Sequence, residues 1–212
     1  MDISKIREEY TKAELIESNM DLNPLLQFKV WFENAVEAKV NEPNAMHLAT
    51  INEHNRPSGR IVLLKYFNES GFSFFSNYNS NKGKDLARNS FACITFFWPE
   101  LERQVRIEGE IWKLSEAESE KYFAERPRKS QIGALASAQS ETVANREVLE
   151  RNFDVIENEY LDKTIPKPLH WGGYILMPNY YEFWQGRRSR LHDRLIYKAT
   201  EGSIWQMERL SP

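Results

Sequence analysis

The stretch Gln104-Val-Arg-Ile-Glu-Gly-Glu-Ile-Trp-Lys-Leu114 decides the kind of fold to expect. From residue 104 to residue 110 polar side chains stand at every second position, separated by Val105, Ile107 and Gly109. A period of two is typical of a strand that buries one face and exposes the other. Gln104 and Arg106 are therefore predicted to point to the same side of a sheet.

Short runs of β-branched and aromatic residues precede this strand. Turn-forming residues at Asn52–Gly59 and Asn68–Gly71 separate them, so the region is predicted to be a meander of strands. The runs are AMHLATI at 45–51, RIVLLKY at 60–66, FSFFS at 72–76 and FACITFFW at 91–98.

Helical signals lie on both sides of the meander. Asn23 followed by Pro24 marks the start of an amphipathic helix, and Ser115 with Glu118 forms a capping box that opens another. The second helix is predicted to end before Pro127, because proline disfavours a helical conformation in the residue that precedes it. A surface helix is also predicted where apolar residues recur at 149, 153, 156 and 160.

Strand patterns return after the helical region. They lie at GGYILM (172–177), YYEFW (180–184), HDRLIYK (192–198) and SIWQMERL (203–210). Strands on both sides of a helical insert most simply complete one sheet. We therefore expect a single domain over 1–212, mainly β with flanking helices, in which 115–163 is a helical insert and 1–22 a mobile charged leader.

Composition excludes several classes of function. Lys and Arg total 28 against 31 Asp and Glu, a net charge of -3, which disfavours nucleic-acid or anionic-membrane binding. The single cysteine, Cys93, stands in no metal-ligand spacing, so neither a metal site nor a disulfide is expected. Apolar runs such as Ile61–Leu64 are far shorter than the roughly 20 residues of a membrane span. The start of the chain has no signal-peptide pattern, so a cytoplasmic location is expected.

Cationic and polar groups recur in four separate segments that could carry chemistry. The first is the strand Arg60–Lys65, and the second is a strand-to-helix turn in which Ser80 caps a helix beside Lys82. In the third, tyrosine, arginine and serine stand four residues apart at 122, 126 and 130. The fourth, Phe183–Arg194, holds four arginines, a histidine and a tryptophan. Each of the first three segments has an ordinary structural explanation, but together they indicate several anion-binding groups.

Nucleotide-binding and hydrolase motifs are absent from the sequence. There is no GxGxxG, GxxxxGK[ST], GxSxG or HExxH, so a Rossmann site, a P-loop, a serine hydrolase and a zinc protease are not supported. An aromatic ligand that carries phosphate fits the remaining pattern best.

The chain resembles the pyridoxine/pyridoxamine 5'-phosphate oxidases, FMN-dependent enzymes that make pyridoxal 5'-phosphate. The resemblance covers nearly the whole chain and is most specific where RIVLLK and WQGRRSRLHDR occur in order. It is carried by IREEY (6–10), PSGRIVLLK (57–65), FFSNYNSNKG (74–83), ERQVRIEG (102–109), YFAERPRKSQIGALAS (122–137) with AQS (138–140), HWGGY (170–174), EFWQGRRSRLHDR (182–194) and ERLSP (208–212). It implies an FMN-binding split β-barrel and a homodimer with two FMN sites at the subunit interface.

The resemblance also implies site residues. One subunit is expected to contact FMN through Arg60, Ile61, Val62, Leu63, Leu64, Lys65, Phe75, Ser76, Asn81, Lys82 and Gln104, and the other through Gln139, Ser140, Trp184 and Arg194. Asn81 stands where the family more often carries arginine. The expected substrate-binding residues are Arg7, Glu8, Glu9, Tyr10, Lys65, Tyr122, Arg126, Ser130, Arg190, Leu191 and His192, of which Arg190 and His192 form the catalytic pair.

The implied reaction is hydride transfer from C4' of pyridoxine or pyridoxamine 5'-phosphate to flavin N5, followed by reduction of O2 to H2O2. The alcohol gives pyridoxal 5'-phosphate directly, and the amine gives it through an imine that water hydrolyses. In an extended segment Arg190 and His192 would project to one side and reach one ligand. Two alternatives remain open at this stage: a split-barrel FMN reductase with another substrate, and a non-catalytic flavin or pyridoxal phosphate binder.

Overall fold

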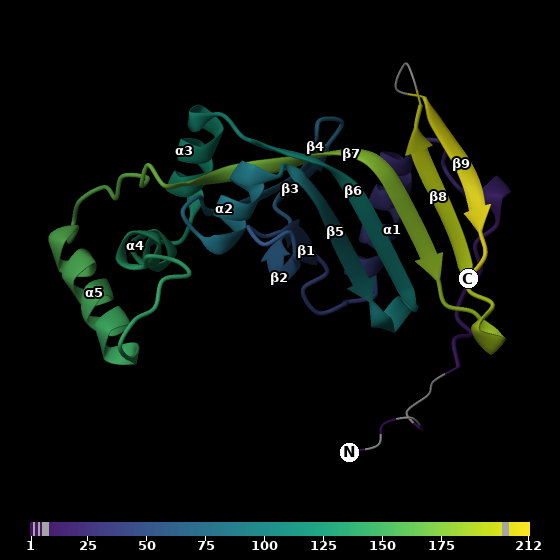
Figure 1. Cartoon of the computed structure of the whole chain (residues 1–212), viewed down its shortest axis with the longest axis horizontal. Helices are drawn as coiled ribbons and strands as arrows, with labels where there is room; N and C mark the ends of the chain where they lie inside the picture. The colour runs from purple at the N-terminus through teal and green to yellow at the C-terminus, as the bar shows by residue number, and fades with distance from the viewer. Residues whose placement is uncertain (2, 4, 6–8, 201–203) are drawn as a thin grey trace.

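The computed structural model describes residues 1, 3, 5, 9–200 and 204–212. Its centre is a nine-stranded sheet in the order β2-β1-β5-β6-β7-β4-β3, and β8 and β9 continue from β7 (Figure 1). The strands are β1 (Ala45–Ile51), β2 (Pro57–Leu63), β3 (Tyr66–Asn68), β4 (Gly71–Asn77), β5 (Phe91–Trp98), β6 (Arg103–Lys113), β7 (Trp171–Gln185), β8 (Asp193–Ala199) and β9 (Trp205–Leu210).

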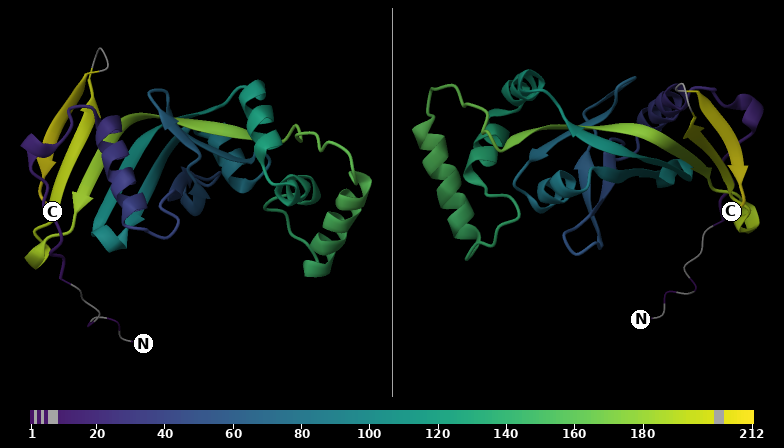
Figure 2. Two further views of the ribbon diagram at one scale, coloured as in Figure 1. Left: turned by 180° about the vertical axis from the view of Figure 1, so that it is seen from behind. Right: turned by 45° about the horizontal axis from the view of Figure 1, so that its top comes forward.

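Helices flank this sheet, and the predicted class, mainly β with flanking helices, is confirmed. The helix α1 covers one face of the sheet, while α3, α4 and α5 gather at the opposite end from β8 and β9 (Figure 2). The helices are α1 (Pro24–Glu37), α2 (Asn81–Arg88), α3 (Glu116–Glu125), α4 (Arg128–Ala136) and α5 (Arg146–Glu159), with the short turns η1 (Glu17–Asn19), η2 (Pro99–Leu101) and η3 (Arg188–Arg190).

The predicted helix starts are found where their capping residues stand. The Asn23 side chain accepts a hydrogen bond from the Leu25 amide at 2.9 Å, and Ser115 and Glu118 form the reciprocal capping box of α3. The chain is extended at residue 126, so α3 ends before Pro127 and α4 begins directly after it. The break turns the chain between α3 and α4.

Several strand boundaries differ from the prediction. The predicted run 60–66 is divided, because β2 ends at Leu63 and β3 begins at Tyr66. Pro57, Ser58 and Gly59 belong to β2 because they pair with the end of β1, and not to the predicted turn. A proline is tolerated as the first residue of a strand, where its missing amide is not needed for the ladder.

The runs 172–177 and 180–184 are one continuous strand, β7, and not two. The register of β7 against β6 shifts between Glu108 and Gly109, and Pro178 lies opposite Gly109. Such a bulge absorbs a residue that cannot donate to the ladder. A side chain at Gly109 would meet the Met177 carbonyl oxygen at 2.1 Å, so glycine permits this close approach.

The long strand β7 organises the molecule. Its first half, from Trp171, pairs with β4, and its second half, ending at Gln185, pairs with β8. The main core lies between α1 and the sheet, where Phe28 packs edge-on against Phe72 with ring centroids 4.9 Å apart. A second core joins Phe123 and Trp171 under the helical insert. The two halves of β7 therefore contact different parts of the molecule, β4 at the start of the strand and β8 at its end. Within the described residues, no helix is both long and apolar enough to cross a membrane.

Candidate active site

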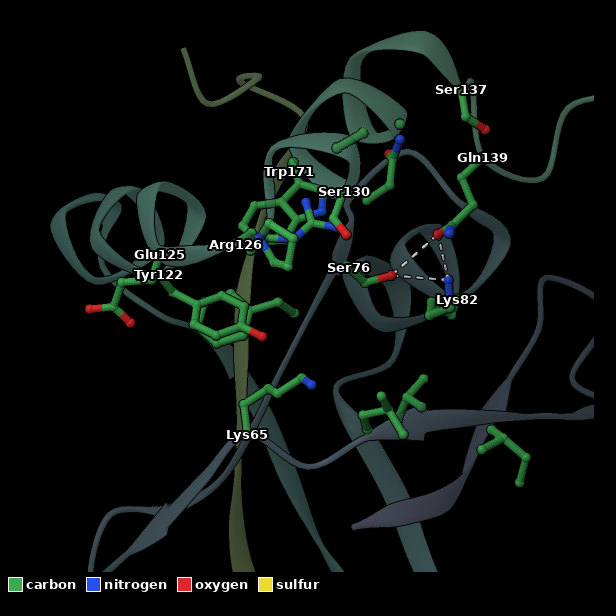
Figure 3. Close-up of a pocket in the computed structure, with 18 residues that line it drawn as sticks. Lys65, Ser76, Lys82, Tyr122, Glu125, Arg126, Ser130, Ser137, Gln139 and Trp171 are labelled. Atoms are coloured by element: carbon green, nitrogen blue, oxygen red, sulfur yellow. Dashed lines mark hydrogen bonds between the residues drawn. The ribbon is translucent and has the colours of Figure 1, made fainter. Parts of the chain in front are cut away.

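A cavity of about 640 Å³ lies where β2 and β4 meet α3 and α4 (Figure 3). Its wall combines apolar strand residues with cations and hydroxyl groups, as expected for an aromatic ligand that carries an anionic group. The lining residues include Ile61, Val62, Leu63, Lys65, Phe75, Ser76, Lys82, Tyr122, Glu125, Arg126, Ser130, Gln139 and Trp171.

Lys82 forms one cationic centre of this cavity. Its Nζ donates to Ser76 Oγ at 3.0 Å and to Gln139 Oε1 at 2.7 Å (Figure 3). It also donates to Ser80 Oγ at 3.1 Å. These partners are all neutral, and burial together with the nearby Arg60 charge lowers the pKa of Lys82 to about 8. An anion placed here would raise this pKa again, since a phosphate compensates both the burial and the neighbouring cation.

Arg60 supports this centre from outside the cavity wall. Its guanidinium donates to Thr50 Oγ1 at 2.7 Å and lies 3.5 Å from Asp85 Oδ2. Asp85 also accepts from Thr50 Oγ1 at 2.7 Å. Arg60 is thus held by a local network, and it acts on Lys82 through its charge.

Arg126 forms the second cationic centre. Its guanidinium carbon lies 4.6 Å from the centre of the Trp171 ring, an arrangement that favours a cation. Nη1 of Arg126 is buried without a hydrogen-bond partner among the described residues. An unpaired buried donor is costly, so this atom is suited to bind an anion that enters the cavity.

Aromatic rings hold Arg126 in place. Tyr122 stacks on Phe75 at 3.9 Å, and Phe75 stacks on Trp171 at 5.5 Å. Tyr122 and Ser130 both line the cavity beside Arg126, although the helix breaks between them. The spacing of four residues therefore brings the three side chains together across a turn, not along one helix.

A second cluster lies at the far end of β7. Trp184 pairs with Gln104 of β6 on one side and with Arg194 of β8 on the other. The His192 ring lies 4.7 Å from the Trp184 ring, and the Tyr10 ring packs edge-on against both at 5.6 and 5.7 Å. This cluster joins Tyr10 of the leader to the loop between β7 and β8, residues 186–192, which carries three arginines.

His192 is held as a neutral donor in this cluster. Its Nδ1 accepts a hydrogen bond from the Arg187 amide at 3.1 Å, so the neutral ring carries its proton on Nε2. Burial, followed by the Arg190 charge, lowers its pKa below the usual 6.5. Nε2 is therefore available to donate a proton or a hydrogen bond to a ligand.

The loop that carries Arg190 is not extended, and the expectation that it would be is wrong. Residues 188–190 form the turn η3, in which Ser189 and Arg190 have φ values of 55° and 61°. Alternation of side chains holds only for extended backbone, so it does not place Arg190 and His192 on one side. Leu191 is 70% exposed between them.

Arg194 is anchored by a buried carboxylate that the sequence did not single out. Glu182 is 3% exposed, and it accepts from Arg194 Nε at 2.8 Å and from Arg106 Nη2 at 2.7 Å. The two guanidinium groups outweigh burial and lower the pKa of Glu182. Glu182 and Trp171 both lay within motifs of the sequence, but their roles depend on contacts across strands and helices.

The predicted site residues fall into these two groups and a few outliers. Gln139 and Ser140 lie beside Lys82 and Asn81 of the same chain, with the Asn81 amide 3.2 Å from Ser140 Oγ. Leu64 is buried in the main core, away from the cavity. Glu9 is exposed, and Arg7 and Glu8 lie outside the described residues.

Comparisons with known proteins match the chain to one family. The family model described as pyridoxamine 5'-phosphate oxidase matches residues 32–160, and the one described as pyridoxine 5'-phosphate oxidase C-terminal dimerisation region matches residues 171–212. A pyridoxine/pyridoxamine 5'-phosphate oxidase of Cyanothece sp. is 52% identical over 100% of this chain and 99% of its own. One of Actinobacillus succinogenes is 51% identical, with 100% of both chains covered.

The fold has a solved counterpart. The crystal structure of PhzG from Burkholderia lata, in complex with tetrahydrophenazine-1-carboxylic acid, has a TM-score of 0.88 and 29% identity over 95% of this chain and 100% of that one. A pyridoxamine 5'-phosphate oxidase-related, FMN-binding protein of Nostoc punctiforme shares the fold with a TM-score of 0.70 and 16% identity, over 91% of this chain and 100% of that one.

The curled sheet with its flanking helices is thus a split barrel of the flavin-binding class, as the resemblance implied. Within that class, the chain belongs to the pyridoxine/pyridoxamine 5'-phosphate oxidase family. It is an enzyme of that family, an oxidoreductase.

Proposed function

We propose that the protein is an FMN-dependent oxidase that converts pyridoxine 5'-phosphate and pyridoxamine 5'-phosphate to pyridoxal 5'-phosphate. The observation that carries this proposal is the pair of cationic centres in one cavity. Lys82 has neutral partners only, and Arg126 has a buried nitrogen without a partner among the described residues. Two anions, each bound by charge-assisted hydrogen bonds, suit these two centres.

The residues present fit FMN as one of the two ligands. The Lys82 centre would hold the phosphate of FMN, together with Ser76, Gln139 and the backbone amides at the N-terminus of α2. The apolar segment Ile61–Leu63 lines the same cavity and would face a flat ring. FMN held there would supply the redox chemistry, a two-electron oxidation at C4' of the vitamin with O2 as the final acceptor.

Arg126 would bind the phosphate of the vitamin, together with Lys65, Tyr122 and Ser130. Figure 3 shows the Lys65 amine and the Tyr122 hydroxyl on the same side of the cavity as Arg126. Fixing the phosphate orients the pyridine ring and brings its reacting carbon to the cofactor in one geometry. Phosphate binding is therefore expected to decide both affinity and orientation.

The second cluster would complete the site from another subunit. Trp171 and Trp184 stand on one strand, and 13 steps of about 3.3 Å place them roughly 40 Å apart along it. FMN is far too short to touch both ends of β7 in one chain. A homodimer, in which the cluster of one subunit meets the cavity of its partner, would resolve this separation, and the dimerisation-region match covers Trp184, His192 and Arg194 of the cluster.

Arg190 and His192 would act on the substrate in that assembled site. The Arg190 cation would stabilise negative charge that develops on the ring, and His192 Nε2 would donate to the substrate or help to move its proton. Tyr10 packs against His192 and would help to exclude water.

The proposed activity has a direct assay. Purified protein loaded with FMN should consume O2 and release H2O2 with either phosphate ester, and much less with the vitamins that lack phosphate. Tetrahydrophenazine-1-carboxylic acid, the ligand of the PhzG structure, carries a carboxylate and no phosphate and is the competing substrate class. Oxidation of that acid without oxidation of the esters would contradict the proposal.

A further inference from the structure

Glu102 is a buried acid with no assigned role. It follows the turn η2 at the start of β6, has a φ of 54°, and is 8% exposed. Charged side chains are rarely buried unless their partners compensate them. The partners of this carboxylate therefore indicate what it does.

Those partners belong to the leader. Glu102 Oε2 accepts hydrogen bonds from the main-chain amides of Thr11 at 2.8 Å and Lys12 at 3.0 Å. The Lys12 ammonium also donates to the Glu100 carbonyl oxygen at 2.6 Å. Two successive amides on one ionised oxygen make a charge-assisted contact that fixes the direction of the chain.

The same residue also holds the end of β7 through its main chain. The Glu102 carbonyl oxygen accepts from the Gly186 amide at 2.8 Å. A side chain at position 186 would lie 2.6 Å from Cγ of Tyr10, so Tyr10 packs directly on the glycine. Glu102 thus joins Tyr10, one residue before Thr11, to the strand that carries Trp184.

Ala13 and Leu15, which follow in the leader, are held by hydrogen bonds that do not involve Glu102. Asp193 Oδ2 accepts from the Leu15 amide at 3.0 Å, and Arg209 Nη2 donates to the Leu15 carbonyl oxygen at 2.7 Å. Arg187 Nη1 donates to the Ala13 carbonyl oxygen at 3.2 Å. Loss of the Glu102 contact should therefore release Tyr10, Thr11 and Lys12 and leave Ala13 and Leu15 in place.

We infer that Glu102 is a positioning residue that acts through Tyr10, holding its ring against Trp184 and His192 so that the bound substrate is covered. The inference rests on the proposed function, because it assigns Tyr10 to the substrate site. It adds a residue that lies outside the site and controls its closure.

The test compares substitutions of two glutamates at the turn η2, Glu102 and Glu100. Glu102→Asn removes the charge and the reach of the side chain, and asparagine tolerates positive φ. Glu102→Gln keeps the reach and should have a smaller effect. Glu100→Asn is the matched control, because among the described residues the exposed Glu100 contacts the leader through its main-chain carbonyl oxygen, which the substitution keeps.

Two readouts are measured on the FMN-loaded protein. Brief native trypsin digestion, followed by mass spectrometry, should show cleavage after Lys12 about tenfold faster in Glu102→Asn, as expected when one charged hydrogen-bond contact is lost. The KM for pyridoxine 5'-phosphate should rise by about the same factor, while kcat and the Kd of FMN stay within about twofold. In a Tyr10→Ala background Glu102→Asn should change KM no further.

Unchanged cleavage after Lys12 would overturn the inference, because Glu102 would then not hold the leader. An increase in KM that persists in the Tyr10→Ala background, or an equal loss of FMN affinity, would also overturn it in favour of a general structural role. If the wild-type protein oxidises neither ester, the proposed function fails, and the cleavage rate still decides whether Glu102 holds the leader.

Discussion

Arg126 is the residue on which the proposed phosphate recognition depends most. Its guanidinium stacks on Trp171 and leaves Nη1 unpaired within the described residues. Replacing it with alanine should raise the KM for pyridoxine 5'-phosphate about ten- to a hundredfold, since a lost charged hydrogen bond is worth about 1.5 to 3 kcal/mol. Steady-state kinetics and FMN titration of Arg126→Ala check this.

Lys129→Ala is the matched control, because Lys129 is an exposed cation of α4 outside the cavity lining. It should leave KM within about twofold of the wild type. An Arg126→Ala protein that loses FMN as strongly as substrate would show that Arg126 does not bind the vitamin phosphate.

Lys82 is expected to make the proposed binding of FMN dependent on pH. Its pKa in the protein without ligand is lowered to about 8, and a bound phosphate dianion should raise it again. FMN affinity should therefore be constant below pH 8 and fall about tenfold for each pH unit above it. Fluorescence titration of the apoprotein from pH 7 to 9.5 measures this.

Lys82→Arg is the control for this titration, because arginine remains charged throughout. Its FMN affinity, even if lower, should stay flat over the same pH range. An equal decline in both proteins would assign the pH dependence to another group.

The catalytic pair is separable by kinetics. Arg190→Leu removes a cation that should stabilise the reacting ring, so flavin reduction should slow as well as substrate binding. His192→Asn should be milder, because asparagine keeps a donor and an acceptor but cannot carry the proton. Anaerobic stopped-flow of FMN-loaded variants decides: normal reduction in Arg190→Leu at saturating substrate would remove Arg190 from the chemistry.

Among the structural elements, β7 links the second cluster to the rest of the sheet. Glu182 on this strand lies between Arg106 and Arg194, and its pKa is lowered from 4.5. Because the folded state binds the proton more weakly than the unfolded one, its contribution to stability is present above pH 4.5 and is lost as the pH falls through the lower folded value.

Glu182→Gln should therefore lower the free energy of unfolding by about 1 to 3 kcal/mol at pH 7. The difference from wild type should shrink as the pH falls below 4.5. Urea unfolding at pH 7 and near pH 4 measures it. Glu108→Gln, a more exposed partner of Arg106, serves as control and should have a smaller effect; equal effects would mean that burial of Glu182 does not matter.

The elements themselves could largely be predicted because their signals are local. The alternation at 104–110 predicted β6, and the capping residues Asn23, Ser80 and Ser115 predicted the starts of α1, α2 and α3. The continuity of β7 could not be predicted, because Pro178 is accommodated by Gly109 on another strand. The left-handed backbone at Ser189 could likewise not be predicted, because no glycine stands at that position to indicate a positive φ.

The candidate site shows the same limit. The residues around Lys82 and Arg126 could be named from the motifs at 74–83 and 122–137. The support from Trp171, Glu182 and Glu102 depends on contacts across the fold, such as the 91 positions that separate Glu102 from Thr11. Such contacts leave no periodic signal in the sequence.

At the scale of the whole molecule, the proposed site would draw on two chains. Trp171 of the cavity wall and Trp184 of the second cluster lie roughly 40 Å apart along β7, so the proposal assigns the cavity and the cluster of one site to different subunits. The protein should sediment as a homodimer at concentrations at which it binds FMN. A monomer that binds FMN tightly at high dilution would contradict this expectation.

The most direct test of a shared site is a purified heterodimer. One subunit carries Arg126→Ala in the cavity and the other Arg190→Leu in the cluster, each with its own affinity tag. If each site draws its cavity from one chain and its cluster from the other, the heterodimer contains one site with both changes and one intact site. At low substrate concentration it should then have about half the wild-type activity per dimer, far above either parent. Activity no higher than the mean of the two parents would contradict the account.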